Sequence, residues 1–405
     1  MPESNYESLP DIDSAVIDEN TELVKSIDYT RPLTDYATAL DISEFIRRRR
    51  KVYDRVSVTP VNGARIVQDD MTVYLRNPAY CSSVLKEALK SPLHLFYAKD
   101  SDHKNRLEEL QKEKECFSLG TVIHSCILEP DKFDSFVFEP EAYRSTTEGV
   151  DFLIKFWEAY ITEHGGNSNG KKVNGWAAVK DAMDFVRAAG RSLDKIDGKR
   201  LYYGRLKEVS GKTVVTEAQK IMIDAIRYNY DRYGGGVLRE LMKGAKTEVS
   251  IYHTDPATGL SVRIRPDGLQ FAENIGHNAI ISVKTTSCES LSHFYYQTAK
   301  YMYELSEGMY LEVAEAATGR PFTATIMIVV QTVPPFAVAA LVWNGEDLEI
   351  GKYKYHQSLL TVSDCVESGK YPGFDVYAER GNMGLIDMKQ PTWNAKELFP
   401  TDIDV

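Results

Sequence analysis

The stretch from residue 247 to residue 369 limits the possible folds most, because strand-like and helix-like segments follow one another closely. TEVSIYH and LSVRIRPDGL alternate apolar and polar residues around Asp255-Pro256-Ala257-Thr258-Gly259, a pattern typical of a β-hairpin. NAIISVKTT predicts a third strand, residues 288–317 a helix, TATIMIVVQTV and AVAALVW two more strands, and KYHQSLLTVSDCVESG a last helix. The order β-β-β-α-β-β-α predicts an α/β domain with a mixed central sheet flanked by helices.

Composition divides the chain into three regions. Residues 1–70 form an acidic N-terminal arm whose beginning is rich in Asp, Glu and Ser with little apolar periodicity, which predicts partial disorder. Residues 71–375 form the main domain. Within it, amphipathic stretches and turn-prone glycines at about 145–240 predict a helical insertion. Residues 376–405 form a C-terminal tail.

The strongest basic run of the chain, Arg47-Arg48-Arg49-Arg50-Lys51, lies in the arm. It is either an arm that contacts phosphates or a solvated helix face beside acidic neighbours. The net charge of the chain is −11, which does not favour tight non-specific binding to DNA. An acidic protein can nevertheless confine a basic surface to one face, so both interpretations of the run stay open.

The remaining composition is that of an intracellular globular protein. No apolar run approaches the about 18 residues that a membrane span needs, and the N-terminus lacks the apolar core of a signal peptide. The five cysteines are scattered without CxxC spacing, which predicts reduced thiols and argues against a zinc site. We therefore expect a cytoplasmic protein.

Three segments together indicate phosphodiester chemistry. They are Arg265-Pro266-Asp267-Gly268 at the end of a hairpin strand, Ser282-Val283-Lys284 on the next strand, and Gly120 to His124 on an earlier helix. Cleavage of a phosphodiester commonly uses a divalent metal held by oxygen or imidazole ligands. Residues two apart on a strand point to one face, so positions 282 and 284 face the same site.

These segments resemble the PD-(D/E)XK superfamily, in which a PD motif is followed by a strand ending in an acid, one residue and lysine. Within it the chain resembles the RecE-like group, the catalytic part of exonuclease VIII. The resemblance rests on the GxxxH helix of FSLGTVIHSCILEPDKF, the SxLKxxxxSPLH segment, the DPATGL hairpin and YHQSLLTVSDCVESGKYPGF, and covers residues 71–375. It implies a restriction-endonuclease-like core.

The resemblance also implies roles for single residues. His124 and Asp267 would be metal ligands, Lys284 the catalytic lysine, and Glu248 a supporting acid. Arg265 and the basic run would contact DNA. The cofactor would be Mg²⁺ or Mn²⁺ and the substrate the end of a linear duplex. A phage or mobile-element origin, a single-strand annealing recombinase as partner and a homo-oligomer are further implications.

Each of these residues also has a plain structural interpretation. Asp267 could be a turn residue after proline, His124 a core histidine on an apolar helix, and Glu248 a solvated strand residue. Lys284 is harder to explain by packing, because a lysine buried in an apolar strand is costly without a partner.

The chain departs from the RecE-like pattern at two positions. Ser282 stands where the family has Asp or Glu, and a neutral hydroxyl is a poor ligand for Mg²⁺. On the following helix, Ser306 stands where the family has the glutamine of Q-x-x-x-Y, whereas Tyr310 matches.

Two explanations of these departures stay open. In the first, the missing acid is supplied by Glu304 or Glu307, which lie three apart on one helical surface, and the protein is a metal-dependent exonuclease. In the second, it is an inactive nuclease fold that binds DNA ends or another protein.

Overall fold

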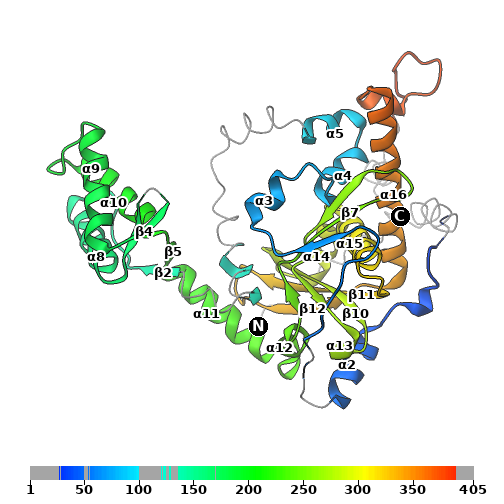
Figure 1. Cartoon of the computed structure of the whole chain (residues 1–405), viewed down its shortest axis with the longest axis horizontal. Coiled ribbons are helices and arrows are strands. Elements are labelled where there is room, and N and C mark those ends of the chain that lie inside the picture. The colour runs from blue at the N-terminus through cyan, green and yellow to red at the C-terminus, as the bar shows by residue number, and fades with distance from the viewer. Residues whose placement is uncertain are drawn as a thin grey trace, which may run out of the picture.

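The computed structural model describes residues 27, 29–49, 53, 55–99, 120, 122–124, 127–128, 136–168 and 170–388. It is a mixed α/β protein with several sheets (Figure 1). No helix within these ranges is long and apolar enough to cross a membrane.

The central sheet has five strands in the order β12-β11-β10-β9-β6. Its strands are β6 (Lys246–Thr247), β9 (Gly268–Gln270), β10 (Asn278–Thr286), β11 (Phe322–Gln331) and β12 (Val338–Val342). β10 runs parallel to β11, whereas β9 and β12 pair antiparallel with their neighbours, so the sheet is mixed as expected. β10 and β11 are buried along almost their whole length, which explains their near-continuous apolar sequence.

The expected hairpin forms but belongs to a second sheet. β7 (Ser250–Thr254) and β8 (Ser261–Ile264) pair antiparallel, and β1 (Arg65–Val67) pairs with the outer side of β7. The Asp255 carboxylate accepts from the backbone N–H of Thr258 at 2.8 Å, which stabilises the turn. The chain then passes through Arg265 to Asp267 into the central sheet, so Asp267 lies at the junction of the two sheets.

The helix expected at 288–317 is two helices, α14 (Leu291–Lys300) and α15 (Tyr303–Thr318). Met302 between them is left-handed, with φ 47° and ψ 54°, which ends the first helix and turns the chain into the second. α15 packs against α16 (Gly345–Ser368), and both helices have a glycine at the crossing. A Cβ on Gly351 would lie 2.0 Å from the carbonyl oxygen of Glu304.

Shorter helices complete the main body. They are η1 (Leu33–Asp35), α2 (Ala39–Arg48), α3 (Met71–Arg76), α4 (Ser82–Ala88), α5 (Pro92–Lys99), α12 (Val237–Met242), α13 (Ala272–Ile275) and η4 (Phe374–Tyr377). α2 begins with a capping box in which the Thr38 and Asp41 side chains bond to each other's backbone N–H. The core on one side of the sheet lies beneath α4, α15 and α16, as the burial of Leu85, Leu305 and Leu359 shows.

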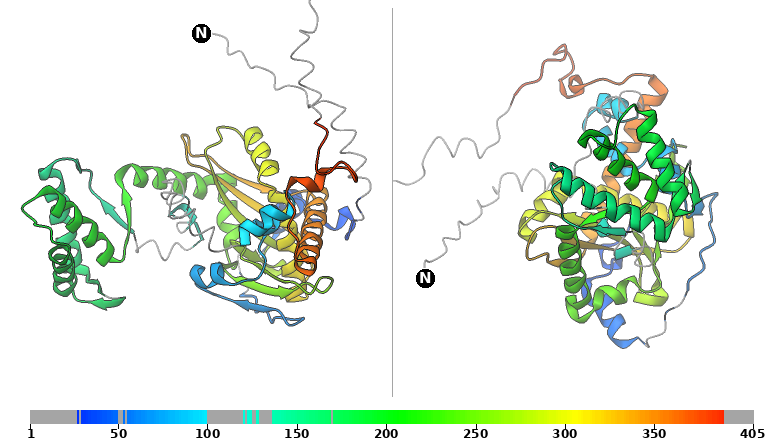
Figure 2. Two further views of the ribbon diagram at one scale, coloured as in Figure 1. Left: turned by 90° about the horizontal axis from the view of Figure 1, so that it is seen from above. Right: turned by 90° about the vertical axis from the view of Figure 1, so that its left-hand side faces the viewer.

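A separate helical unit occupies residues 136–216 and packs around a core of its own that includes Trp157, Val186 and Leu206. It contains β2 (Phe136–Glu139), α8 (Thr147–His164), β3 (Gly166–Ser168), β4 (Lys171–Val173), α9 (Gly175–Ala188), α10 (Ile196–Ser210) and β5 (Thr213–Thr216). In Figures 1 and 2 it stands apart from the sheet and is joined to the main body by α11 (Glu217–Arg232).

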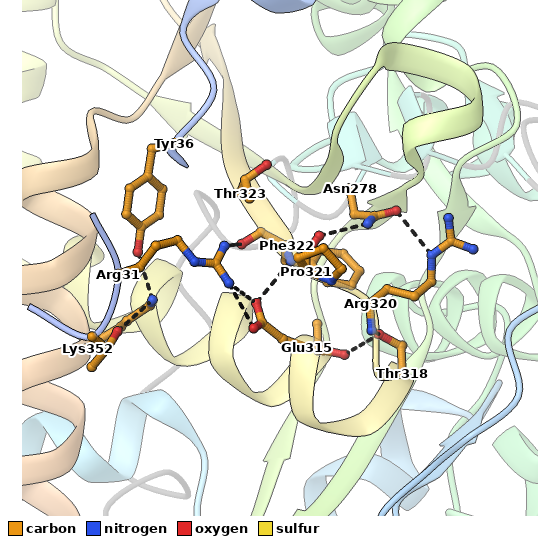
Figure 3. A network of polar contacts seen from close by, with 12 residues as sticks. Arg31, Tyr36, Asn278, Glu315, Thr318, Arg320, Pro321, Phe322, Thr323 and Lys352 are labelled. Carbon is orange, nitrogen blue, oxygen red and sulfur yellow. Dashed lines mark hydrogen bonds and ion pairs between the residues drawn. The ribbon is translucent and has the colours of Figure 1, made fainter. Parts of the chain in front are cut away.

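The N-terminal segment 29–37 is bound to the main body by polar contacts (Figure 3). Arg31 donates to both carboxylate oxygens of Glu315, at 2.8 and 2.7 Å, and to the carbonyl of Phe322 at 2.9 Å. The backbone N–H of Thr30 donates to Glu349 at 2.7 Å. This part of the expected arm is therefore ordered, and β1 adds a further contact.

Candidate functional site

The side chain of Asp267 is hydrogen-bonded to β10, the middle strand of the central sheet. Pro266 ends the passage from β8, and Asp267 immediately precedes β9, whose Gly268 pairs with Ile281 of β10. One carboxylate oxygen of Asp267 accepts a hydrogen bond of 2.5 Å from the backbone N–H of Val283. The side chain of Asp267 is 17% exposed, so it meets both the strand and solvent.

His124 lies beside Asp267. Its Nδ1 atom is 3.5 Å from the other carboxylate oxygen of Asp267, and its side chain is 30% exposed. Gly120, one turn earlier, lies near β10, since a Cβ on it would be at an ordinary contact distance of 3.4 Å from the hydroxyl oxygen of Thr285. This turn therefore lies next to the strand that carries Lys284.

Glu307 places a carboxylate beside Ser282. The Ser282 hydroxyl donates to Glu307, with its oxygen 2.8 and 3.0 Å from the two carboxylate oxygens. Glu307 is completely buried, and burial raises its pKa to about 7, while Lys284 and the Ser282 hydroxyl act in the opposite direction. A carboxylate from α15 therefore lies against Ser282 of the strand.

Lys284 lies among these acids on β10. Burial favours its neutral amine, but the negative charges of Asp267 and Glu307 outweigh burial and raise its pKa above the usual value. Its ammonium nitrogen is also 5.6 Å from the ring centroid of Tyr303, the first residue of α15. Lys284 is thus a charged lysine near neutral pH.

Lys86 is a site residue that the sequence reasoning missed. It extends from α4, and its ammonium nitrogen lies 5.3 Å from the centroid of the same Tyr303 ring. Burial, together with repulsion from Lys284, lowers its pKa to about 8, although Glu307 and Glu304 favour the charged form. Lys86 follows the buried Leu85, so the sequence places it at the edge of the buried face of α4. The sequence does not indicate which residues of other elements lie near Lys86. We call Lys86 and Lys284 the lysine pair.

Glu304, the other candidate for the missing acid, has a different partner. It is 7% exposed, and its carboxylate accepts from Lys354 of α16 at 2.5 Å. Glu304 and Glu307 therefore both lie away from solvent, and only Glu307 contacts Ser282. Ser306 and Tyr310, the two positions compared with the Q-x-x-x-Y pattern, also lie within α15. Burial raises the pKa of Tyr310 well above its usual value.

Glu248 and Arg265 pair with each other. Arg265 Nε donates to the Glu248 carboxylate at 2.8 Å, and Arg265 Nη1 donates to the Ser250 hydroxyl at 2.9 Å. Glu248 has a positive φ of 55°, and its backbone N–H donates to the carbonyl of Asp267 at 3.3 Å. The pair therefore supports the backbone beside Asp267, and the Arg265 side chain is only 10% exposed.

Arg49 of the basic run is turned inward. Its side chain is 8% exposed and lies 3.1 Å from the carboxylate of Glu240 in α12. It also donates to the carbonyl of Asn274. Arg49 therefore ties the end of α2 to the main body.

The neighbouring cations are placed differently. Arg48 pairs with Glu44 one turn earlier on the exposed face of α2, at 2.7 Å, and Arg47 bonds to a serine of the same helix. Arg50 and Lys51 lie outside the described residues. In the part of the run that the structure describes, Arg47 and Arg48 are the exposed cations.

Asp267, Glu307 and His124 offer oxygen and imidazole donors of the kinds that Mg²⁺ or Mn²⁺ accepts. Within the described ranges, however, no group of three or more His, Cys, Asp or Glu side chains is arranged to hold a metal ion. Asp267 instead bonds to the backbone of β10, and Glu307 bonds to Ser282. The arrangement in this structure does not fit the cation.

The chain has only weak similarity to the known proteins that it was compared with. No protein-family model matches the chain, and no curated protein matches its sequence. A putative exonuclease from Eubacterium rectale is similar with a TM-score of 0.30 and 10% identity over 56% of this chain and 79% of that chain. The structure of SSO0001 is similar with a TM-score of 0.23 and 14% identity over 58% of this chain and 92% of that chain. Both TM-scores are low, so the two structures do not indicate a function for this chain.

Proposed function

We propose that the lysine pair binds a phosphate group of DNA, with the end of a linear duplex as the ligand. The observation that carries the proposal is the convergence of Lys86 and Lys284 on one tyrosine ring, 5.3 and 5.6 Å from its centroid. The positive charge of Lys284 repels that of Lys86 and, together with burial, lowers the pKa of Lys86. A bound phosphate would relieve this repulsion.

The charges around the pair support an anionic ligand. Asp267 already shares its carboxylate with His124 and the backbone of Val283. Because burial raises the pKa of Glu307 to about 7, this acid is about half protonated at neutral pH. The lysine pair is therefore only partly neutralised, which favours a phosphate and disfavours a second cation.

Metal-dependent hydrolysis of the DNA is a second candidate, and one observation favours it. The Ser282–Glu307 hydrogen bond supplies a carboxylate at the strand position where the acid is missing. In that case Asp267, Glu307 and His124 would hold Mg²⁺ or Mn²⁺, which supplies charge stabilisation at the phosphate. Their present arrangement does not enclose a cation, so the first proposal is the better supported.

Binding to a labelled blunt duplex in EDTA, followed by fluorescence anisotropy, tests the first proposal. Lys86→Ala and Lys284→Ala should each weaken binding on the order of tenfold, as expected for loss of a partly buried charge contact. The matched control is Lys90→Ala, because Lys90 lies four residues after Lys86 but pairs with Glu87 at the surface. Thermal melts of the variants establish that they are folded.

Equal affinity of wild type and both lysine variants in EDTA would overturn the proposal. Incubation of the same duplex with Mg²⁺ and with Mn²⁺ tests the second candidate. Degradation that is lost in Glu307→Gln and in Lys284→Ala would establish hydrolysis and the role of Glu307. An intact duplex in both metals would exclude it.

A further inference from the structure

Three tyrosine side chains are exposed on helix α14 and at the residue that follows it. Phe294 is the only buried residue of this helix. Tyr295, Tyr296 and Tyr301 are 53%, 51% and 49% exposed. We call these three residues the tyrosine face. Isolated apolar residues at a surface need no explanation, but Tyr301 lies against the ring that both lysines approach, so it extends the site to the surface.

Tyr301 connects the tyrosine face to the lysine pair. Its ring stacks on that of Tyr303, with centroids 5.9 Å apart and an interplanar angle of 26°. The Tyr303 ring is the one that both Lys86 and Lys284 approach. Lys300 adds a further ammonium group 5.9 Å from the Tyr301 centroid. A continuous path of stacked rings and cations thus leads from the buried lysines to the surface.

The local charge of this surface suits a polyanion. The segment 291–301, LSHFYYQTAKY, contains a lysine and a histidine and no acidic residue, in a chain whose net charge is −11. A nucleic-acid strand offers phosphates to the cations and base faces to the rings. The combination of aromatic platforms with positive charge is the usual means of binding single strands.

We infer that the tyrosine face stacks the unpaired bases of a single-stranded DNA end whose phosphate is held by the lysine pair. The inference rests on the proposed function and names the form of its ligand. Interior bases of a duplex are covered on both faces and the last pair of a blunt end exposes only one, so an unpaired nucleotide offers Tyr301 more base surface to stack on. The site therefore takes an overhang or a frayed end in preference to a blunt end.

The experiment compares the affinity of the full-length protein, in EDTA, for a blunt duplex and for the same duplex with an overhang of a few nucleotides. Wild type should bind the overhang on the order of tenfold more tightly, as expected for stacking of one base. Tyr301→Ala should abolish this preference, whereas Tyr301→Phe should keep it because the ring remains. Tyr143→Ala is the matched control, since Tyr143 is 81% exposed on the helical unit.

A third ligand separates bases from phosphates. An overhang of abasic nucleotides keeps the phosphates and lacks the rings, so wild type should bind it no better than a blunt end. A preference that survives in Tyr301→Ala, or that is as large for the abasic overhang, would overturn the inference. The same holds if wild type shows no preference, as expected if the tyrosine face bound a protein or a second copy of the chain.

Failure of the proposed function is recognised separately. Lys284→Ala should weaken binding of blunt and overhang duplexes alike, whereas Tyr301→Ala should weaken binding of the overhang duplex more than that of the blunt duplex. If Lys284→Ala changes neither affinity, the lysine pair does not bind the phosphate, whatever the tyrosine variants show.

Discussion

At the scale of single residues, one proton on Glu307 sets the charge around the lysine pair. Burial raises the pKa of Glu307 to about 7, so the folded protein holds this proton below that pH and releases it above. The site therefore loses about two-thirds of a unit of positive charge as pH rises from 6 to about 7.5. We expect DNA affinity in EDTA to fall roughly two- to fourfold over this interval, measured by anisotropy at constant ionic strength.

The variant Glu307→Gln removes the titrating group and should make affinity nearly independent of pH up to about 7.5. A second decline near pH 8 should remain in both proteins, because the pKa of Lys86 is lowered to about 8 and its charge is lost there. An affinity that instead rises with pH in wild type would contradict this account. Metal-dependent hydrolysis instead predicts cleavage in Mg²⁺ or Mn²⁺ that rises with pH, since metal ligands must be deprotonated.

The sequence predicted part of this site because the signal was local. Asp267 and Lys284 follow from motif spacing, and the chain brings Asp267 against the strand that carries Lys284. Helical spacing could not choose between Glu304 and Glu307, since the choice depends on which strand and which helix each one meets. Lys86 is the lysine of the SxLKxxxxSPLH segment, but the sequence assigned it no role, because its environment is created by the approach of α4 to α15.

At the scale of elements, the crossing of α15 and α16 depends on the absence of two side chains. A Cβ on Gly351 would lie 2.0 Å from the carbonyl oxygen of Glu304, and one on Gly308 would lie 2.5 Å from the backbone nitrogen of Lys352. Both obstacles are backbone, so the helices must separate. Gly351→Ala should lower the free energy of unfolding by about 1–3 kcal/mol, measured by urea denaturation.

The matched control is Gly204→Ala in the middle of α10, where a Cβ would meet no atom within 4 Å. There alanine should be neutral or should stabilise by up to about 1 kcal/mol, because it favours the helix. Similar effects at the two positions would show that the close approach of α15 and α16 is not what Gly351 permits.

The elements themselves were largely readable from the sequence, but their breaks and pairings were not. The hairpin and the strands β10, β11 and β12 follow from alternation and from apolar runs. The break at Met302 was missed because a left-handed methionine has no local signature. The pairing of β7 with β1 was missed because the partners Arg65 and Tyr252 lie far apart in sequence.

At the scale of the whole molecule, Arg31 holds the N-terminal segment against the body. Its side chain is 14% exposed and bonds to both oxygens of Glu315 and to the carbonyl of Phe322. Arg31→Ala removes one donor from these acceptors, although Glu315 still accepts from the backbone N–H of Phe322 at 3.1 Å and keeps access to water. We expect a loss of about 1–2 kcal/mol in the free energy of unfolding, measured by urea denaturation.

Arg48→Ala supplies the comparison, because Arg48 pairs with Glu44 on an exposed helix face where ion pairs contribute little. Its effect should stay within about 0.5 kcal/mol. Equal losses for the two arginines would mean that the segment 29–37 contributes no more than a surface salt bridge.

The contacts of this segment also affect the order of folding during synthesis on the ribosome. Arg31 and Glu315 are separated by 284 positions, and Thr30 and Glu349 by 319. At translation speeds of about 5–20 residues per second, roughly 15–60 s pass between the emergence of Arg31 and that of Glu315. The segment 29–37 therefore cannot form these contacts until Glu315 and Glu349 have been synthesised. Its docking is a late event in the folding of each new molecule.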